Sequence, residues 1–103
     1  MDALSAKRRE TRQALALDVA ARILRDAGDH GIDITLVGSL AKGDFRAHSD
    51  VDLLVRGQLD RKRRLLAERL VADGMRGCDI PYDLIFEDDL ADDRLQEFLD
   101  DIV

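Results

Sequence analysis

Residues 34–55 read ITLVGSLAKGDFRAHSDVDLLV and hold two of the three predicted strands. This segment opens with the β-prone run 34–37 and closes with the apolar run 51–55, and the residues between them are typical of a turn. A third run, YDLIF, covers residues 82–86. All three runs are nearly continuous in apolar residues, which predicts strands of a sheet that is covered on both faces.

Helices are predicted before, between and after these strands. Apolar residues recur at helical spacing from about residue 4 to 27, over 59–73 and over 90–102. Gly28 and Gly74 are expected to end the first two helices. In the second helix, three leucines are expected to face the core: Leu65, Leu66 and Leu70. In the last helix, one apolar stripe is expected from Ala91, Leu95, Phe98, Leu99 and Ile102. The order of elements predicts a small α/β domain with three strands and about three helices.

Length and charge set further bounds. The 103 residues fit a single domain over 1–103, and no apolar stretch approaches the ~20 residues that a bilayer-spanning helix needs. The net charge is -6, and residues 79–103 hold ten Asp and Glu against one Arg, which disfavours a nucleic-acid surface there. The N-terminus is charged and lacks a signal core, and Cys78 is the one cysteine, so we expect a cytoplasmic protein without disulfides.

A phosphate-binding turn is predicted where the first strand ends. Gly38 lets the backbone approach a ligand closely, and Ser39 offers a hydroxyl at a point where a short helical turn would present free N–H groups. Lys42 and Arg46 would add positive charge for phosphate oxygens. Gly38-Ser39 on its own also fits a plain strand-ending turn.

Three carboxylates are predicted to form a metal site. Asp50 and Asp52 open the second strand, and alternate positions on a strand point to the same side. Two adjacent carboxylates repel unless a proton or a cation lies between them, and hard oxygen ligands beside a phosphate site favour Mg²⁺. Asp83 lies in the middle of an apolar strand, where an acid is costly unless it is paired or metal-bound. If its strand lies beside 51–55, Asp83 completes the site; a surface position or an ion pair with an arginine is the alternative.

The spacing of these residues resembles a known signature. Gly-Ser, ten residues and then Asp-x-Asp is the pattern of the nucleotidyltransferase superfamily related to DNA polymerase β, and Gly38, Ser39, Asp50 and Asp52 match it without a gap. Asp83 matches the later acidic position. Lys42 stands where many members have Arg. The short length resembles the minimal nucleotidyltransferases that serve as antitoxins in HEPN/MNT toxin–antitoxin pairs.

The resemblance implies a fold, a reaction and a partner. The fold is a minimal nucleotidyltransferase fold with a small mixed sheet flanked by helices. The reaction is transfer of AMP from ATP, with two Mg²⁺ ions held by Asp50, Asp52 and Asp83, to a tyrosine hydroxyl of a HEPN-domain RNase toxin. Gly38, Ser39, Lys42 and Arg46 would bind the triphosphate. Two other functions remain open: an antitoxin that blocks its toxin only by binding, and a nucleotidyltransferase that modifies a small molecule such as an aminoglycoside.

Overall fold

The computed structural model describes residues 3–100. Helices and strands alternate along this part of the chain. Their bounds in chain order are α1 (Ala3–Asp29), β1 (Ile34–Val37), α2 (Gly38–Lys42), β2 (Val51–Val55), α3 (Arg61–Met75), β3 (Tyr82–Phe86), the 3-10 turn η1 (Glu87–Asp89) and α4 (Asp92–Asp100).

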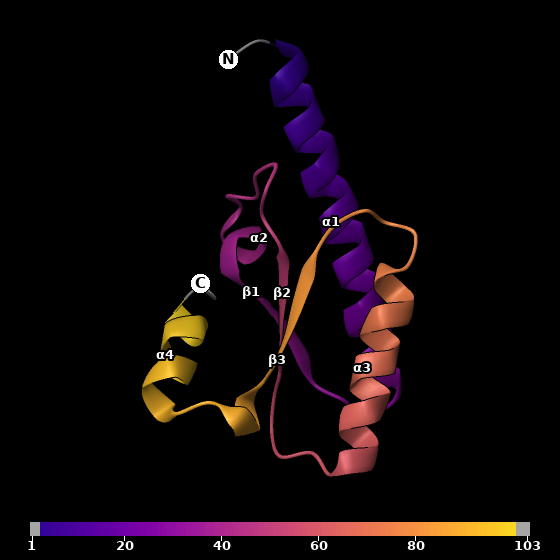
Figure 1. Cartoon of the computed structure of the whole chain (residues 1–103), viewed down its shortest axis with the longest axis vertical. Helices are drawn as coiled ribbons and strands as arrows, with labels where there is room; N and C mark the ends of the chain where they lie inside the picture. Colours follow the sequence, from indigo (N-terminus) through magenta and orange to yellow (C-terminus); the bar gives the residue numbers. More distant parts are fainter. Residues whose placement is uncertain (1–2, 101–103) are drawn as a thin grey trace.

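The three strands form one mixed sheet in the order β1-β2-β3. β1 and β2 are antiparallel, whereas β2 and β3 are parallel and are joined through α3. α1 and α3 lie on one side of the sheet, and α2 and α4 lie on the other (Figure 1). The predicted α/β class with a small mixed sheet is confirmed.

The core lies between the sheet and the pair α1 and α3. Val51, Leu53 and Val55 alternate along β2 and are fully buried in this layer. Because successive strand residues point to opposite faces, Asp52 and Leu54 face the other side of the sheet. The sheet therefore has one apolar face under two long helices and a second face that carries an acid.

The second face is covered less completely than the predicted sheet with both faces covered, although Val37 and Leu54 on this face are fully buried. Asp83 of β3, which shares this face with Asp52, is exposed. The helices on this side are short, and no residue of α4 is buried. α4 begins at Asp92, its Leu95, Phe98 and Leu99 are half-buried, and the predicted stripe residue Ile102 lies outside the described residues.

Both glycines that were expected to end helices lie inside them. α1 continues past Gly28 to Asp29, and the chain turns where Gly31 adopts a φ of 71° and the Ile32 N–H donates to the Ala27 carbonyl at 2.8 Å. α3 continues past Gly74 to Met75. A Cβ at Gly74 would overlap the side chain of Ile23, so this glycine allows α3 to pack closely on α1.

Leu65 is also placed differently from the prediction. It is 55% exposed, whereas Leu66 and Leu70 are half-buried against the core. The buried stripe of α3 is centred on Ala67 and Val71. Leu65 lies two residues before Ala67, which is about 200° around a helix, so it points away from the sheet. No helix within residues 3–100 combines the length and the apolar character that a membrane span requires.

Candidate active site

Two of the three predicted acids lie side by side on adjacent strands. Asp52 of β2 and Asp83 of β3 are Cα partners in the parallel pair. Paired residues of neighbouring strands point to the same face of the sheet. Both carboxylates line a pocket of about 450 Å³. The structure therefore brings Asp52 and Asp83 together on the face that is turned away from α1 and α3.

Gly38 lies directly against one of these acids. Its predecessor Val37 is the β1 partner of Asp52, and a Cβ on Gly38 would overlap the Asp52 carboxylate. Gly38 also has a φ of 75°, a conformation that other residues adopt only with strain. Both observations require glycine at position 38. The backbone of the predicted phosphate turn therefore lies next to Asp52.

The predicted helical turn after the first strand is confirmed as α2. Ser39 is its second residue and is half-buried. Gly43 closes the turn with a φ of 79°, and the Asp44 N–H donates to the Ser39 carbonyl at 2.9 Å. The hydroxyl-bearing residue thus follows the point where Gly38 meets Asp52.

Lys42 and Arg46 lie farther along this connection. Lys42 is the last residue of α2 and is exposed. Arg46 is exposed in the following loop, where its Nε donates to the Asp44 carboxylate at 3.2 Å. Neither side chain lines the pocket of Asp52 and Asp83. Their contact with phosphate stays a prediction.

Asp50 precedes β2 and is half-buried. The next residue, Val51, donates its N–H to the Pro81 carbonyl at 2.9 Å, which ties this point of the chain to the segment before β3. Within residues 3–100, no three side chains of His, Cys, Asp or Glu lie close enough to form a metal-binding group. The structure pairs Asp52 with Asp83 but does not gather Asp50 into one compact cluster with them.

The far wall of the pocket comes from η1 and α4. Asp89, Leu90, Arg94 and Phe98 line it, and the Arg94 guanidinium lies 5.9 Å from the centre of the Phe98 ring. Phe98 was predicted on the apolar stripe of the last helix, and no role was predicted for Arg94. One signal was present, because Arg94 is the one cation in the acidic residues 79–103. The pocket therefore combines two carboxylates on its floor with a cation and an aromatic ring on its wall.

An ion pair and a cation–π contact, both made by Arg64, hold this wall of the pocket in place. Arg64 of α3 binds the Asp89 carboxylate through both terminal nitrogens, at 3.2 and 2.6 Å, and its guanidinium stacks 4.2 Å from the Phe86 ring centre. The hydrogen bond between the two side chains lowers the pKa of Asp89 and raises that of Arg64. These contacts fix η1, and with it the start of α4, relative to α3.

Glu87, the first residue of η1, is held from the other side. Its carboxylate accepts the Gly57 N–H at 2.6 Å and the Arg56 Nε at 3.1 Å. The backbone hydrogen bond from Gly57, followed by the Arg56 contact, lowers the pKa of Glu87. The segment that leaves β3 is thereby tied to the end of β2.

The donor set fits a magnesium ion. Asp52 and Asp83 offer hard carboxylate oxygens, and the absence of a Cβ at Gly38 makes room for the Asp52 carboxylate. Adjacent carboxylates of like charge favour a cation between them.

Comparison with known protein families agrees with this geometry. The profile of the family described as "Nucleotidyltransferase domain" matches residues 17–103. The chain belongs to this family. As a nucleotidyltransferase it transfers a nucleotide, and its family generally uses a nucleoside triphosphate and Mg²⁺. The match includes all seven predicted site residues, namely Gly38, Ser39, Lys42, Arg46, Asp50, Asp52 and Asp83. A search of curated proteins gives no match.

The nucleotidyltransferase fold is built here on three strands and four α-helices within residues 3–100. The sheet register pairs Asp52 with Asp83, and the Gly38 turn lies against Asp52. Of the seven predicted site residues, these two acids alone line the pocket described above. The match begins at residue 17 and therefore leaves the first half of α1 outside the family profile.

Proposed function

We propose that this nucleotidyltransferase transfers AMP from ATP to a tyrosine hydroxyl of a HEPN-domain RNase toxin and thereby acts as its cytoplasmic antitoxin. The observation that carries the proposal is the register of Asp52 and Asp83 beside Gly38. The two acids line one pocket and Gly38 lies against one of them, Asp52, and paired acids of this kind support Mg²⁺-dependent attack on a nucleotide phosphate.

The triphosphate would lie against the turn of Gly38 and Ser39. The Ser39 hydroxyl would supply a hydrogen bond to a phosphate oxygen, and the space that a Cβ on Gly38 would need is taken by the Asp52 carboxylate. Lys42 and Arg46 would approach from the solvent side. The nucleoside would extend toward the α4 wall, where Phe98 offers a ring for stacking and Arg94 a positive charge. The pocket volume of about 450 Å³ is within the range of roughly 300–1,000 Å³ that small-molecule sites occupy.

Asp50, Asp52 and Asp83 would hold two Mg²⁺ ions, in line with the resemblance. When bound, the ions supply positive charge at the attacking oxygen, the α-phosphate and the leaving pyrophosphate. The reaction forms a bond from the acceptor oxygen to the α-phosphorus and breaks the bond from that phosphorus to the bridging oxygen. Asp83, which is exposed on β3, would accept the proton of the acceptor hydroxyl. Pyrophosphate leaves with the electron pair of the broken bond.

The exposure of Asp83 supports a macromolecular acceptor. Its side chain and that of the neighbouring Tyr82 are open to solvent at the rim of the sheet. An acceptor carried on a second protein could reach this exposed acid from the solvent side. A tyrosine on a partner protein satisfies this geometry.

The test incubates the chain with a HEPN toxin, ATP and Mg²⁺ and measures the intact mass of the toxin. We expect a gain of one or more AMP units and a loss of RNase activity. Asp52→Asn and Asp83→Asn should abolish the gain, whereas Asp29→Asn, an exposed acid at the end of α1, should not. Inhibition of the toxin without a mass gain would favour the binding-only antitoxin. Transfer to an aminoglycoside but not to the toxin would favour the small-molecule enzyme.

A further inference from the structure

The loop between α2 and β2 carries Asp50 to the sheet. Residues 43–50 have no regular secondary structure, yet Asp50 must be presented at a defined place if it is to act with Asp52. A loop of this kind needs contacts from elsewhere in the fold to hold its last residue.

Arg12 of α1 makes these contacts. Its Nε donates to the Arg46 carbonyl at 3.3 Å, and its Nη2 donates to the Ser49 carbonyl at 3.0 Å. Its guanidinium also lies 5.1 Å from the ring centre of Phe45, which is buried. One side chain from the N-terminal half of α1 therefore contacts three residues of the loop: Phe45, Arg46 and Ser49.

The bonds converge on the backbone of Asp50. The Ser49 carbonyl belongs to the peptide bond that precedes Asp50, and Arg12 holds it. The N–H of Val51 belongs to the peptide bond that follows Asp50, and the Pro81 carbonyl holds it at 2.9 Å. Both peptide planes next to Asp50 are thus fixed, one by α1 and the other by the approach to β3.

Hydrogen bonds within the loop also involve the Arg46 carbonyl that Arg12 binds. The Ser49 N–H donates to the Arg46 carbonyl at 3.1 Å, and the Arg46 N–H donates to the Ser49 Oγ at 2.8 Å. The Arg46 carbonyl accepts from both Ser49 and Arg12, so the arginine locks a turn that is already formed.

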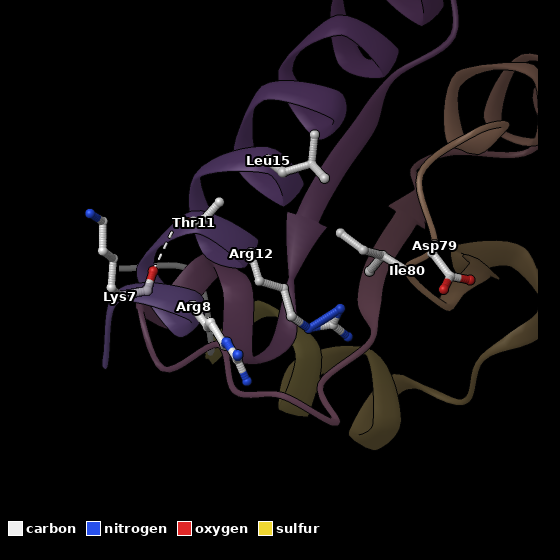
Figure 2. A pocket seen from close by; sticks show the side chains of 7 residues that line it. All are labelled: Lys7, Arg8, Thr11, Arg12, Leu15, Asp79 and Ile80. Atoms are coloured by element: carbon white, nitrogen blue, oxygen red, sulfur yellow. Dashed lines mark hydrogen bonds between the residues drawn. The ribbon is translucent and has the colours of Figure 1, made fainter. Parts of the chain in front are cut away.

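Figure 2 shows how Arg12 differs from its neighbours on α1. Lys7, Arg8, Arg12 and Leu15 line one side of an open pocket, and Ile80 lies across from them. The Arg12 side chain extends toward the side of Ile80 and Asp79, the Lys7 side chain points the opposite way, and the Arg8 side chain ends farther from Ile80 than that of Arg12 (Figure 2). Arg8 is therefore a matched control: an exposed arginine on the same helix beside the same pocket.

We propose that Arg12 is a positioning residue that sets the place of Asp50 in the active site. The proposal rests on the proposed function, since it takes Asp50 to be one of the metal-binding acids. Arg12 lies outside residues 17–103, so its role is a feature of this chain's α1 and is not covered by the family match. The planar guanidinium is needed because Nε and Nη2 donate to two carbonyls from one rigid plane, which a lysine ammonium on a flexible stem cannot reproduce.

The experiment compares Arg12→Gln, Arg12→Lys and Arg8→Gln by two readouts. The first is hydrogen exchange of individual backbone amides measured by NMR, which does not depend on activity. We expect the Arg46 and Ser49 amides to exchange about tenfold faster or more in Arg12→Gln, with core amides of β2 unchanged. Arg8→Gln should match the wild type. Unchanged exchange of Arg46 and Ser49 in Arg12→Gln would overturn the proposal.

The second readout is AMP transfer as a function of Mg²⁺ and ATP. A misplaced Asp50 should lower kcat by roughly 10²-fold, and it should raise the Mg²⁺ concentration for half-maximal rate while the KM for ATP changes little. Arg12→Lys keeps the positive charge but should recover only part of the rate. Full recovery in Arg12→Lys, or a wild-type kcat in Arg12→Gln, would refute a positioning role. If the wild type itself transfers no AMP, the proposed function fails, and the exchange measurement still decides whether Arg12 holds the loop.

Discussion

The Asp52 carboxylate lies against the Cα of Gly38, in the space that any side chain at position 38 would need. This relationship joins β1 to β2 at the end where β1 stops and the phosphate turn begins. Glycine is needed at position 38 for two reasons: the backbone has a positive φ there, and a Cβ would overlap the Asp52 carboxylate.

Gly38→Ala should therefore cost more than the backbone strain alone. A positive φ at a residue other than glycine costs about 1–3 kcal/mol, and the overlap with Asp52 adds to it. Gly43→Ala is the control, because Gly43 has a φ of 79° but an added Cβ would meet nothing within 4 Å. Urea unfolding should show a larger loss of stability for Gly38→Ala, together with loss of nucleotide transfer. Equal losses of stability would show that the overlap with Asp52 has no energetic consequence.

Asp83→Asn should stabilise the metal-free protein and remove its response to magnesium. Like charges directly opposite on neighbouring strands destabilise a sheet by roughly 0.2–1 kcal/mol, and the substitution removes one of them. Mg²⁺ should raise the melting temperature of the wild type but not of Asp83→Asn or Asp52→Asn, because a ligand stabilises only a fold that binds it. A magnesium response of wild-type size in both variants would argue against metal binding by this pair.

Phe98→Ala should weaken ATP binding. Stacking of a base on an aromatic ring contributes about 1–3 kcal/mol, so the dissociation constant measured by calorimetry should rise by roughly tenfold or more. Leu99→Ala removes another half-buried apolar side chain from α4 but does not line the pocket, and its dissociation constant should stay near that of the wild type. If both variants bind ATP as the wild type does, the nucleoside lies elsewhere.

Protonation of Glu87 in acid should lower the stability of the protein. Its pKa in the folded state lies below its ordinary value of 4.5, because the Gly57 N–H and Arg56 stabilise the charged form. Its contribution to stability is therefore complete above the unfolded-state pKa and is lost as the pH falls through the lower folded-state pKa. Glu87→Gln should lower the unfolding free energy at pH 7 and flatten its decline below about pH 4.5. Glu97→Gln, an exposed acid on α4, is the control, and identical acid profiles for Glu87→Gln and the wild type would contradict this role.

The parts of the fold that the sequence predicts well are those with a short-range signal. The strand Val51–Val55 is an apolar run interrupted by Asp52, and Gly38-Ser39 marks the end of its partner strand Ile34–Val37, so the bounds of both strands agree with the prediction. The pairing of Asp52 with Asp83 was expected on the condition that their strands are neighbours, and the sheet order confirms that condition.

The parts that escaped prediction depend on contacts between distant segments. Gly74 resembles a helix end in sequence, but its role is set by Ile23 on another helix. Phe98 has the spacing of a core residue, yet α4 stands off from the sheet and leaves it on a pocket wall. Arg12 carries no local signal, because its partners lie 34 and 37 residues away.

The parallel pairing of β2 with β3 links correct folding to catalysis. If β3 slipped by a single position, every one of its side chains would change face. Asp83 would then be driven among the aliphatic residues beneath α1 and α3, and a leucine or a tyrosine would take its place opposite Asp52. A mispaired chain would lose stability and activity together, so a mutation that loosens this register cannot leave behind a stable but inactive enzyme.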